Sequence, residues 1–438
     1  MNIKSFFFRV LVLGIGVEIM LLGNIFGYPL PKESPRKRTE KWLHRLSRVL
    51  RHELGLVKKG LKGRKMRGVE PNFVYGAYKE ASFTLEKGIP VLRVFGNPYE
   101  MGYQQGKLVG KQIKILNQFY LDLLMDTKKK KKPAFAFIKK LEPYIPKDYK
   151  EEMKGIADGA GIPYEEVLFG HTFLDLFHSQ IVACSTVGIM PFRSVTGETL
   201  FGRNLDFPSL GFVHKFSIII VYHPKGKPVI VSVGWPGLGG VLTGMNEYGL
   251  SLGMMSIQFE DFHWGGFPMF WLFRHILETC KTVPEAIKLL QKTRLSVASN
   301  LMLADPKSLA VAELLPSNKQ FRFPSQQGVI HSTNHFQHPK IRKFIPSGTY
   351  FSSFVRSHII SHTLGKAPQK VDWKFVRKIL QKVCIKGINL QSMVIVPSRK
   401  AFYLAIGSTE SAKKDFTYLE WKDLVIQRKE KKWAPSQK

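Results

Sequence analysis

Cysteine is scarce in this chain. Only Cys184, Cys280 and Cys384 occur in 438 residues, and no two of them form a CxxC pair or the spacing of metal ligands. This pattern argues against a disulfide framework and a metal site, and we expect no cofactor. Because the number is odd, at least one thiol stays unpaired even if the other two bond, so a reactive cysteine is worth seeking.

Acidic residues are also few. The chain has 33 Asp and Glu against 66 Lys and Arg, a formal charge of +33, and its 44% hydrophobic residues suffice for a large core. That composition excludes a disordered chain, and the charge favours an anionic partner. Neither a zinc-finger spacing nor a basic stretch with interleaved aromatic residues occurs, so we expect no nucleic acid partner, while an anionic membrane surface stays open. Nothing in the sequence indicates an oligomeric state.

One apolar run lies near the start of the chain. It covers residues 10–26 and follows Lys4 and Arg9, which is typical of a signal peptide or membrane anchor, here predicted over residues 1–30. The protein is therefore expected to be exported (periplasmic or extracellular) or membrane-anchored through its N-terminus. Glu18 interrupts the run and no clean small-x-small cleavage site follows it, so an uncleaved anchor stays open.

A basic linker is predicted over residues 31–80. Between positions 42 and 57, apolar side chains recur at helical spacing among Arg and Lys, which predicts an amphipathic cationic helix. This helix would either adhere to an anionic membrane surface or pack one face on the main domain, and the spacing alone does not separate the two.

The rest of the chain has two parts. Residues 81–183 are predicted to form a mainly helical segment, and residues 184–438 a segment with many short apolar runs bounded by Gly, Pro and Asn. Strands are expected at 90–95, 216–222, 228–233, 250–255, 301–303, 393–396 and 402–406, and helices at 268–280 and 284–291. Strands, then helices, then strands predict an α+β domain with sheets packed face to face and helices outside.

Cys184 opens the strand-rich part, within the sequence IVACST at 181–186. A lone cysteine in such a place is by default a small buried apolar residue. Arg203 and Asp206 follow in the strand-like sequence GRNLDF at 202–207. Since an isolated buried charge is costly, they form either a structural ion pair or a functional one, in which a cation lowers a thiol pKa and a carboxylate orients an amine.

Three further residues are candidates for an acyl-transfer site. Asn246 lies in the turn GMNEYGL and Asn334 in HSTNHF after a strand, while Arg356 lies near the start of a helix. Asparagine amides can donate to a developing oxyanion. Asn246 on its own also suits a turn with positive φ, so a purely structural role stays open for it.

These segments, in this order, resemble the N-terminal-nucleophile hydrolase superfamily. The resemblance is closest to the acyl-coenzyme A:6-aminopenicillanate acyltransferase (peptidase C45) family, with choloylglycine hydrolases and acid-ceramidase-like amidases as relatives, and it covers about residues 90–408. The matching segments are GNPYEMG at 96–102 with Gly106, residues 152–161 with Pro163, Cys184-Ser185, Arg203-Asn204-x-Asp206, MNEYGL at 245–250 and TNHF at 333–336.

The resemblance implies a four-layer αββα sandwich in which Cys184 begins a strand at a sheet edge. It implies that the chain cuts itself before Cys184, which then acts as nucleophile. Arg203 and Asp206 would hold the freed amine and the thiol. Asn246 and Asn334 would help to form the oxyanion hole, and Arg356 would brace the site.

The implied reaction cleaves or transfers the acyl group of a linear amide, such as an N-acyl amide, a penicillin-type or an acyl-amino-acid substrate. Cleavage before Cys184 would free an α-amine with a reference pKa of roughly 7.7 to 8.0, which suits a general base near neutral pH. Attack by the thiolate would give a thioester, resolved by water in a hydrolase or by an amine in an acyltransferase.

Other functions stay open at this point. A phospholipase-B-like lipid hydrolase would share the fold and nucleophile, and a non-catalytic basic protein would bind a membrane surface. A cysteine–histidine protease would take its base from His171, His178, His331 or His335. Apolar residues around Trp235, Phe267, Phe270 and Trp271 would line an acyl pocket or belong to the core.

Overall fold

The computed structural model describes residues 68–121, 128–176, 183–257, 263–344 and 351–425. The predicted signal peptide or anchor at 1–30 and most of the predicted linker at 31–80 lie outside these ranges. Among the helices that are described, none combines the length and apolar character that crossing a bilayer requires.

Two β-sheets form the centre of the molecule. Sheet A has ten strands, in the spatial order β1 (Gly76–Tyr78), β2 (Ala81–Glu86), β3 (Ile89–Gly96), β6 (Ile218–Pro224), β7 (Ile230–Gly234), β8 (Thr243–Asn246), β9 (Ser251–Ser256), β10 (Ser299–Ala304), β11 (Leu309–Leu314) and β12 (Lys319–Arg322). Sheet B has six, in the order β13 (Val329–Ser332), β4 (Ala183–Ile189), β5 (Leu200–Asp206), β14 (Asn389–Val396), β15 (Ala401–Ile406) and β16 (Thr417–Leu419).

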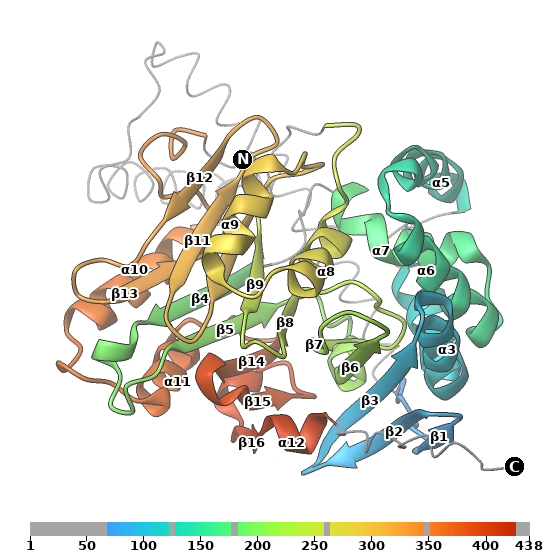
Figure 1. Ribbon diagram of the computed structural model, residues 1–438, viewed down its shortest axis with the longest axis horizontal. Coiled ribbons are helices and arrows are strands. Elements are labelled where there is room, and N and C mark those ends of the chain that lie inside the picture. Colours follow the sequence, from blue (N-terminus) through green and yellow to red (C-terminus); the bar gives the residue numbers. More distant parts are fainter. Residues whose placement is uncertain (1–67, 122–127, 177–182, 258–262, 345–350, 426–438) are drawn as a thin grey trace, which may run out of the picture.

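Helices cover the outer faces of both sheets (Figure 1). The helices are α3 (Pro98–Ile115), α5 (Lys128–Leu141), α6 (Lys147–Ala160), α7 (Tyr164–Leu176), α8 (Met269–Thr279), α9 (Val283–Lys292), α10 (Phe351–Gly365), α11 (Trp373–Lys382) and α12 (Trp421–Leu424). Helices α8 and α9 contact sheet A, whereas α10 and α11 contact sheet B. The sheets face each other through β4 and β9, so the order of layers is helix, sheet, sheet, helix. The predicted four-layer αββα fold is confirmed.

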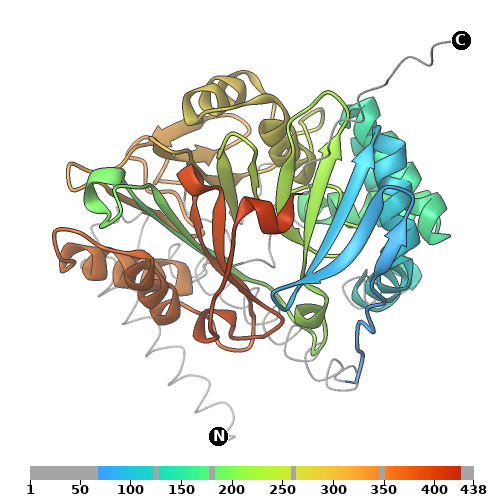
Figure 2. The same cartoon turned by 60° about the horizontal axis from the view of Figure 1, so that its bottom comes forward.

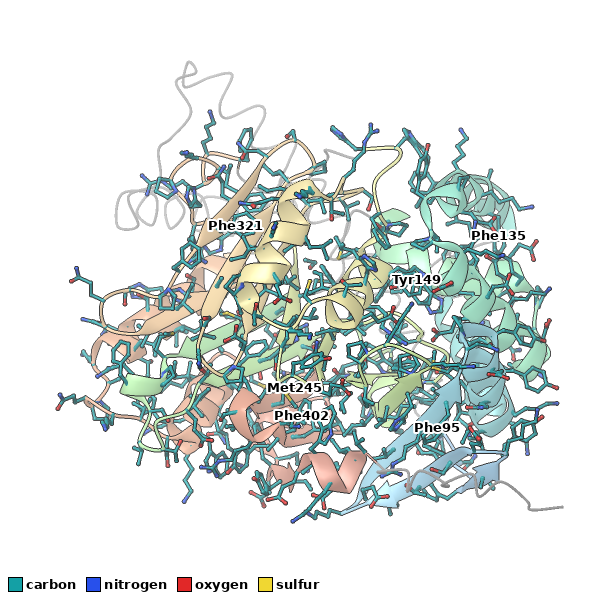
Figure 3. All side chains as sticks on the ribbon, in the orientation of Figure 1. Phe95, Phe135, Tyr149, Met245, Phe321 and Phe402 are labelled. Carbon is teal, nitrogen blue, oxygen red and sulfur yellow. The ribbon has the colours of Figure 1, made fainter. Side chains whose placement is uncertain are left out.

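The main core lies between the two sheets. Met245 of sheet A and Phe402 of sheet B are fully buried in the same apolar cluster, which also includes Cys184 (Figure 3). The view in Figure 2 shows the red strands of sheet B beside the yellow-green strands of sheet A. A second apolar cluster, which includes Val376 and Leu380 of α11, fastens the helices to the outer face of sheet B.

Strands β3 and β6 connect the parts of the chain that precede and follow Cys184. They pair in parallel, with Val91 opposite Ile219. The predicted mainly helical segment at 81–183 therefore also supplies β2 and β3 to sheet A. A cut before Cys184 would leave two fragments that share one sheet, so they would stay associated.

Glycines set the distance between α3 and α6. A Cβ atom added to Gly102 would lie 2.0 Å from the carbonyl oxygen of Glu152, and one added to Gly155 would lie 2.2 Å from the carbonyl oxygen of Tyr99. Only glycine permits backbones to approach so closely. The glycines at 102, 106, 155 and 159 belong to the two motifs that precede Cys184, and the structure explains both motifs as one helix crossing.

We expect Gly155→Ala to lower the free energy of unfolding by roughly 1–3 kcal/mol or more, because the added methyl group must push α3 and α6 apart. Denaturant unfolding would measure the change. Gly170→Ala in α7 is the matched control, since a Cβ there meets nothing within 4 Å, and alanine is the better helix former. Equal stability of the two variants would contradict this packing.

Candidate active site

Cys184 is the second residue of β4 and is fully buried. Its neighbour across the sheet on one side is Leu205 of β5, whereas on the other side β13 pairs only with residues 186–189 and does not reach Cys184. The sequence correctly places Cys184 at the start of a strand. The edge strand of sheet B is β13 and not β4, but Cys184 lies beyond the pairing with β13 and so has a strand neighbour on one side only.

Arg203 holds the thiol. Its side chain extends from β5 into the space between the sheets, where Nη2 donates to Cys184 Sγ at 3.5 Å and Nε donates to the hydroxyl of Thr243 in β8. Burial raises the pKa of the Cys184 thiol above its usual value, and the positive charge of Arg203 opposes that shift. The thiol therefore needs a base to become a thiolate near neutral pH.

Asn334 and Arg356 hold the backbone around Cys184. The backbone nitrogen of Cys184 donates to Asn334 Oδ1 at 2.8 Å, and Arg356 Nη2 donates to the same oxygen at 2.8 Å. Arg356 Nη1 donates to the carbonyl oxygen of Cys184 and to Ser185 Oγ. The nitrogen held here is the one that a cut before Cys184 would turn into an α-amine.

Asp206 lies beside the predicted cleavage point. Its Cα pairs with that of Ala183 across β4 and β5, and its Oδ1 accepts from Asn389 Nδ2 at 2.9 Å. Its other oxygen, Oδ2, is buried and has no hydrogen-bond partner among the described residues. Burial raises the pKa of this carboxyl to about 6, against the opposing charge of Arg356. A buried carboxyl with a vacant acceptor is well placed to receive a new ammonium group.

Asn246 does not join this group. Its Nδ2 donates to the carbonyl oxygens of Leu277 and Cys280 at the end of α8, and its Oδ1 accepts from the backbone nitrogens of Tyr248 and Leu250. In this structure the amide protons of Asn246 bind the end of a helix, which is the structural role left open for it, and its oxyanion role stays a prediction.

The described histidines have partners other than the thiol. His335 Nδ1 lies 2.8 Å from Ser353 Oγ, and burial lowers its pKa to about 3. His331 Nε2 lies 2.9 Å from Ser357 Oγ, and His171 Nε2 accepts from the backbone nitrogen of Gly239. His178 lies outside the described residues. The geometry thus gives no support to a cysteine–histidine pair. In the described ranges, no three His, Cys, Asp or Glu side chains converge as metal ligands would.

Three positioning residues were not predicted from the sequence. Thr243 binds Arg203, Asn389 binds Asp206, and Ser256 accepts from Asn334 Nδ2 through its carbonyl oxygen at 2.8 Å. The only available signal was a polar residue at the start or end of an apolar strand, which is too common to single out a site.

A mostly apolar cavity adjoins the cluster. Phe207, which follows Asp206, and Leu242, which precedes Thr243, both line it. Trp235 and Phe270 also line the cavity, as an acyl pocket requires. Trp271 belongs to the core instead, where its ring stacks on those of His171 and Tyr149.

Comparison with known proteins gives matches that cover part of the chain. The model of the acyl-coenzyme A:6-aminopenicillanic acid acyl-transferase family matches residues 195–377. An uncharacterised protein of Archaeoglobus fulgidus is 28% identical over 205 residues, 40% of this chain and 34% of its own. Acid ceramidase of Mus musculus is 28% identical over 192 residues, 37% of this chain and 46% of its own. The solved structure of the Caenorhabditis elegans N-acylethanolamine-hydrolyzing acid amidase ortholog has 19% identity and a TM-score of 0.40, covering 54% of this chain and 100% of that one.

The family match includes Arg203, Asp206, Asn334 and Arg356, and it begins after Cys184. The chain spans less than two thirds of the length of the curated relatives, 34% of the first and 46% of the second. The resemblance drawn from the sequence is confirmed over residues 195–377, where this chain is similar to the acyl-coenzyme A:6-aminopenicillanic acid acyl-transferase family.

Proposed function

We propose that this protein is an autoprocessed cysteine N-terminal-nucleophile enzyme that cleaves or transfers the acyl group of a linear amide through a thioester. One observation carries the proposal. The thiol and the backbone nitrogen of Cys184 are both bound by buried side chains, Arg203 on the sulfur and Asn334 on the nitrogen, with the vacant oxygen of Asp206 on the neighbouring strand.

Maturation would begin with the thiol of Cys184 adding to the carbonyl carbon of Ala183. The C–N bond then breaks as a C–S thioester bond forms, and the departing nitrogen takes up a proton as the α-amine of Cys184. Water cleaves the thioester, which leaves a carboxylate on Ala183 and a free thiol on Cys184. The vacant oxygen of Asp206 would accept a hydrogen bond from the new amine.

Turnover would use the same groups. The α-amine takes the proton of the thiol, whose pKa is too high for it to ionise unaided. The thiolate attacks the substrate amide, and Asn334 Nδ2 turns from the carbonyl oxygen of Ser256 to donate to the oxyanion. The substrate amine leaves with the proton. Water or an acceptor amine then resolves the thioester.

The cavity supports an acyl chain as the part of the substrate that is bound. Its lining is mostly apolar; Phe207 follows Asp206 in the chain, and Leu242 precedes Thr243, which binds Arg203. One relative is named N-acylethanolamine-hydrolyzing acid amidase, which supports a linear N-acyl amide as the substrate class.

The test is to incubate the purified full chain with a long-chain N-acyl amide whose amine product is fluorescent, and to locate the trapped acyl group by mass spectrometry after acid quenching. We expect amine release and an acylated peptide that begins with Cys184. Acylation of another residue, or activity only on a phospholipid ester, would refute the proposal and favour the phospholipase-B-like alternative.

Gly170→Leu should shorten the acyl chain that the enzyme accepts. Gly170 lines the cavity, and a side chain added there meets nothing within 4 Å at its Cβ. Because the new side chain would occupy space for several methylene groups, we expect kcat/KM for a long-chain amide to fall at least about tenfold relative to a short-chain one. Gly170→Ala is the control. An equal fall for both chain lengths would place the acyl group elsewhere.

A further inference from the structure

Exposed lysines recur in and around α11, three within the helix and three in the segments that flank it. Lysine recurs at every fourth position, and all six side chains are exposed: Lys366, Lys370, Lys374, Lys378, Lys382 and Lys386, which we call the lysine ridge. Residues four apart lie on one face of a helix, so the three lysines within α11 point the same way. In the part of the chain that the structure covers, no lysine of the ridge forms an ion pair; nearby, Arg377 pairs with Asp415 and Lys413 with Glu410.

The opposite face of α11 fixes the direction of the ridge. Val376, Ile379 and Leu380 are fully buried against sheet B, and Asp372 caps the helix by accepting from the backbone nitrogen of Phe375. The three lysines within α11 therefore face solvent, and the positive charges of the ridge repel one another unless an anionic partner neutralises them.

Two exposed apolar side chains lie beside one end of the ridge. Phe192 is 59% exposed and Val195 is 60% exposed, in the loop between β4 and β5. That loop is bound to the residue after Lys370, because Val195 N donates to the carbonyl oxygen of Val371 and Val371 N donates to that of Arg193, each at 2.9 Å. Exposed apolar side chains next to a row of lysines are typical of proteins that lie on a bilayer surface.

We propose that the lysine ridge, with Phe192 and Val195, docks this protein on an anionic lipid bilayer. The lysines would neutralise lipid headgroups, and the two apolar side chains would enter the bilayer interface. A nucleic acid would leave these two side chains exposed to water. The other end of the ridge approaches the cavity: Lys386 is two residues from Ile388, whose carbonyl oxygen accepts from the backbone nitrogen of Phe207 at 2.7 Å. This surface goes beyond the proposed function and does not depend on it.

Co-sedimentation of the full chain with vesicles tests the proposal. We compare phosphatidylcholine vesicles with vesicles that also contain phosphatidylserine, for the parent and for the triple variant Lys374→Glu, Lys378→Glu, Lys382→Glu. Each lysine near an anionic surface raises the partition coefficient by a factor of roughly five. We therefore expect the partition coefficient of the triple variant into anionic vesicles to be on the order of a hundredfold lower than that of the parent. Binding of the parent should fall as salt rises.

The matched control replaces three exposed lysines with glutamate on α3, which lies on the other side of the molecule (Figure 1). These are Lys107, Lys111 and Lys114. The control has the same net charge as the ridge variant and should keep binding close to the parent. An equal loss in both variants would overturn the proposal, because net charge alone would then explain binding. Unchanged vesicle binding by the ridge variant, with loss of binding to a DNA duplex, would overturn it too. Phe192→Ser with Val195→Ser should weaken vesicle binding several-fold, most visibly at high salt.

Discussion

Replacing Cys184 by alanine should abolish both chain cleavage and amide turnover. The variant loses the sulfur atom that would attack Ala183 and later the substrate, and no other described nucleophile takes its place between Arg203 and Asn334. We expect a single uncut chain on a denaturing gel, and turnover no higher than the rate without enzyme.

Cys280 and Cys384 supply matched controls for the loss of a thiol. Cys280 is buried beside α8, and Cys384 is half-buried after α11. Alanine at either position should leave cleavage and turnover close to those of the parent. Normal turnover in Cys184→Ala, or its loss in Cys280→Ala or Cys384→Ala, would place the reactive thiol elsewhere.

Asn334→Ala should lower the turnover of a chain that has already been cut by roughly a hundred- to thousandfold, the typical cost of losing one oxyanion donor. The substitution also releases Arg356 and the nitrogen of Cys184, which share Asn334 Oδ1. We therefore expect self-cleavage to slow as well, while KM stays close to that of the parent. Kinetics of the chain matured before purification would separate these effects.

His335→Ala is the comparison that tests the competing mechanism. His335 adjoins Asn334 in the chain, but its ring binds Ser353 and stacks on Phe354, with centroids 4.2 Å apart. We expect a moderate loss through destabilisation of that segment. If His335→Ala were inactive while Asn334→Ala behaved like the parent, a cysteine–histidine mechanism would replace the one proposed here.

The sequence predicted the strands and helices that have strong local signals. The expected strand at 250–255 is β9 and the expected helix at 268–280 is α8, because Gly249 precedes the apolar run of the strand and Pro268 precedes that of the helix. β11 and β12 were not predicted. They follow a tight connection after β10, and the four residues of β12 are all half-buried and mixed in character, so no alternation marks that strand.

The candidate site was predicted through motif order rather than through periodicity. Cys184, Arg203, Asp206, Asn334 and Arg356 come from four separate segments, and the structure brings all five together. Asn246 does not join them, since a turn asparagine looks the same in sequence whether its amide binds a substrate or, as here, the end of a helix. Thr243 and Asn389 contact the site only across sheets or strands, which local sequence does not record.

N-terminal sequencing of the purified, active protein, combined with mass measurement under denaturing conditions, tests the central claim most directly. The proposal predicts a fragment that begins Cys184-Ser185-Thr186, released from its partner fragment only on denaturation, because β3 and β6 belong to one sheet. A fully active protein whose chain remains uncut at the bond between Ala183 and Cys184 would contradict it.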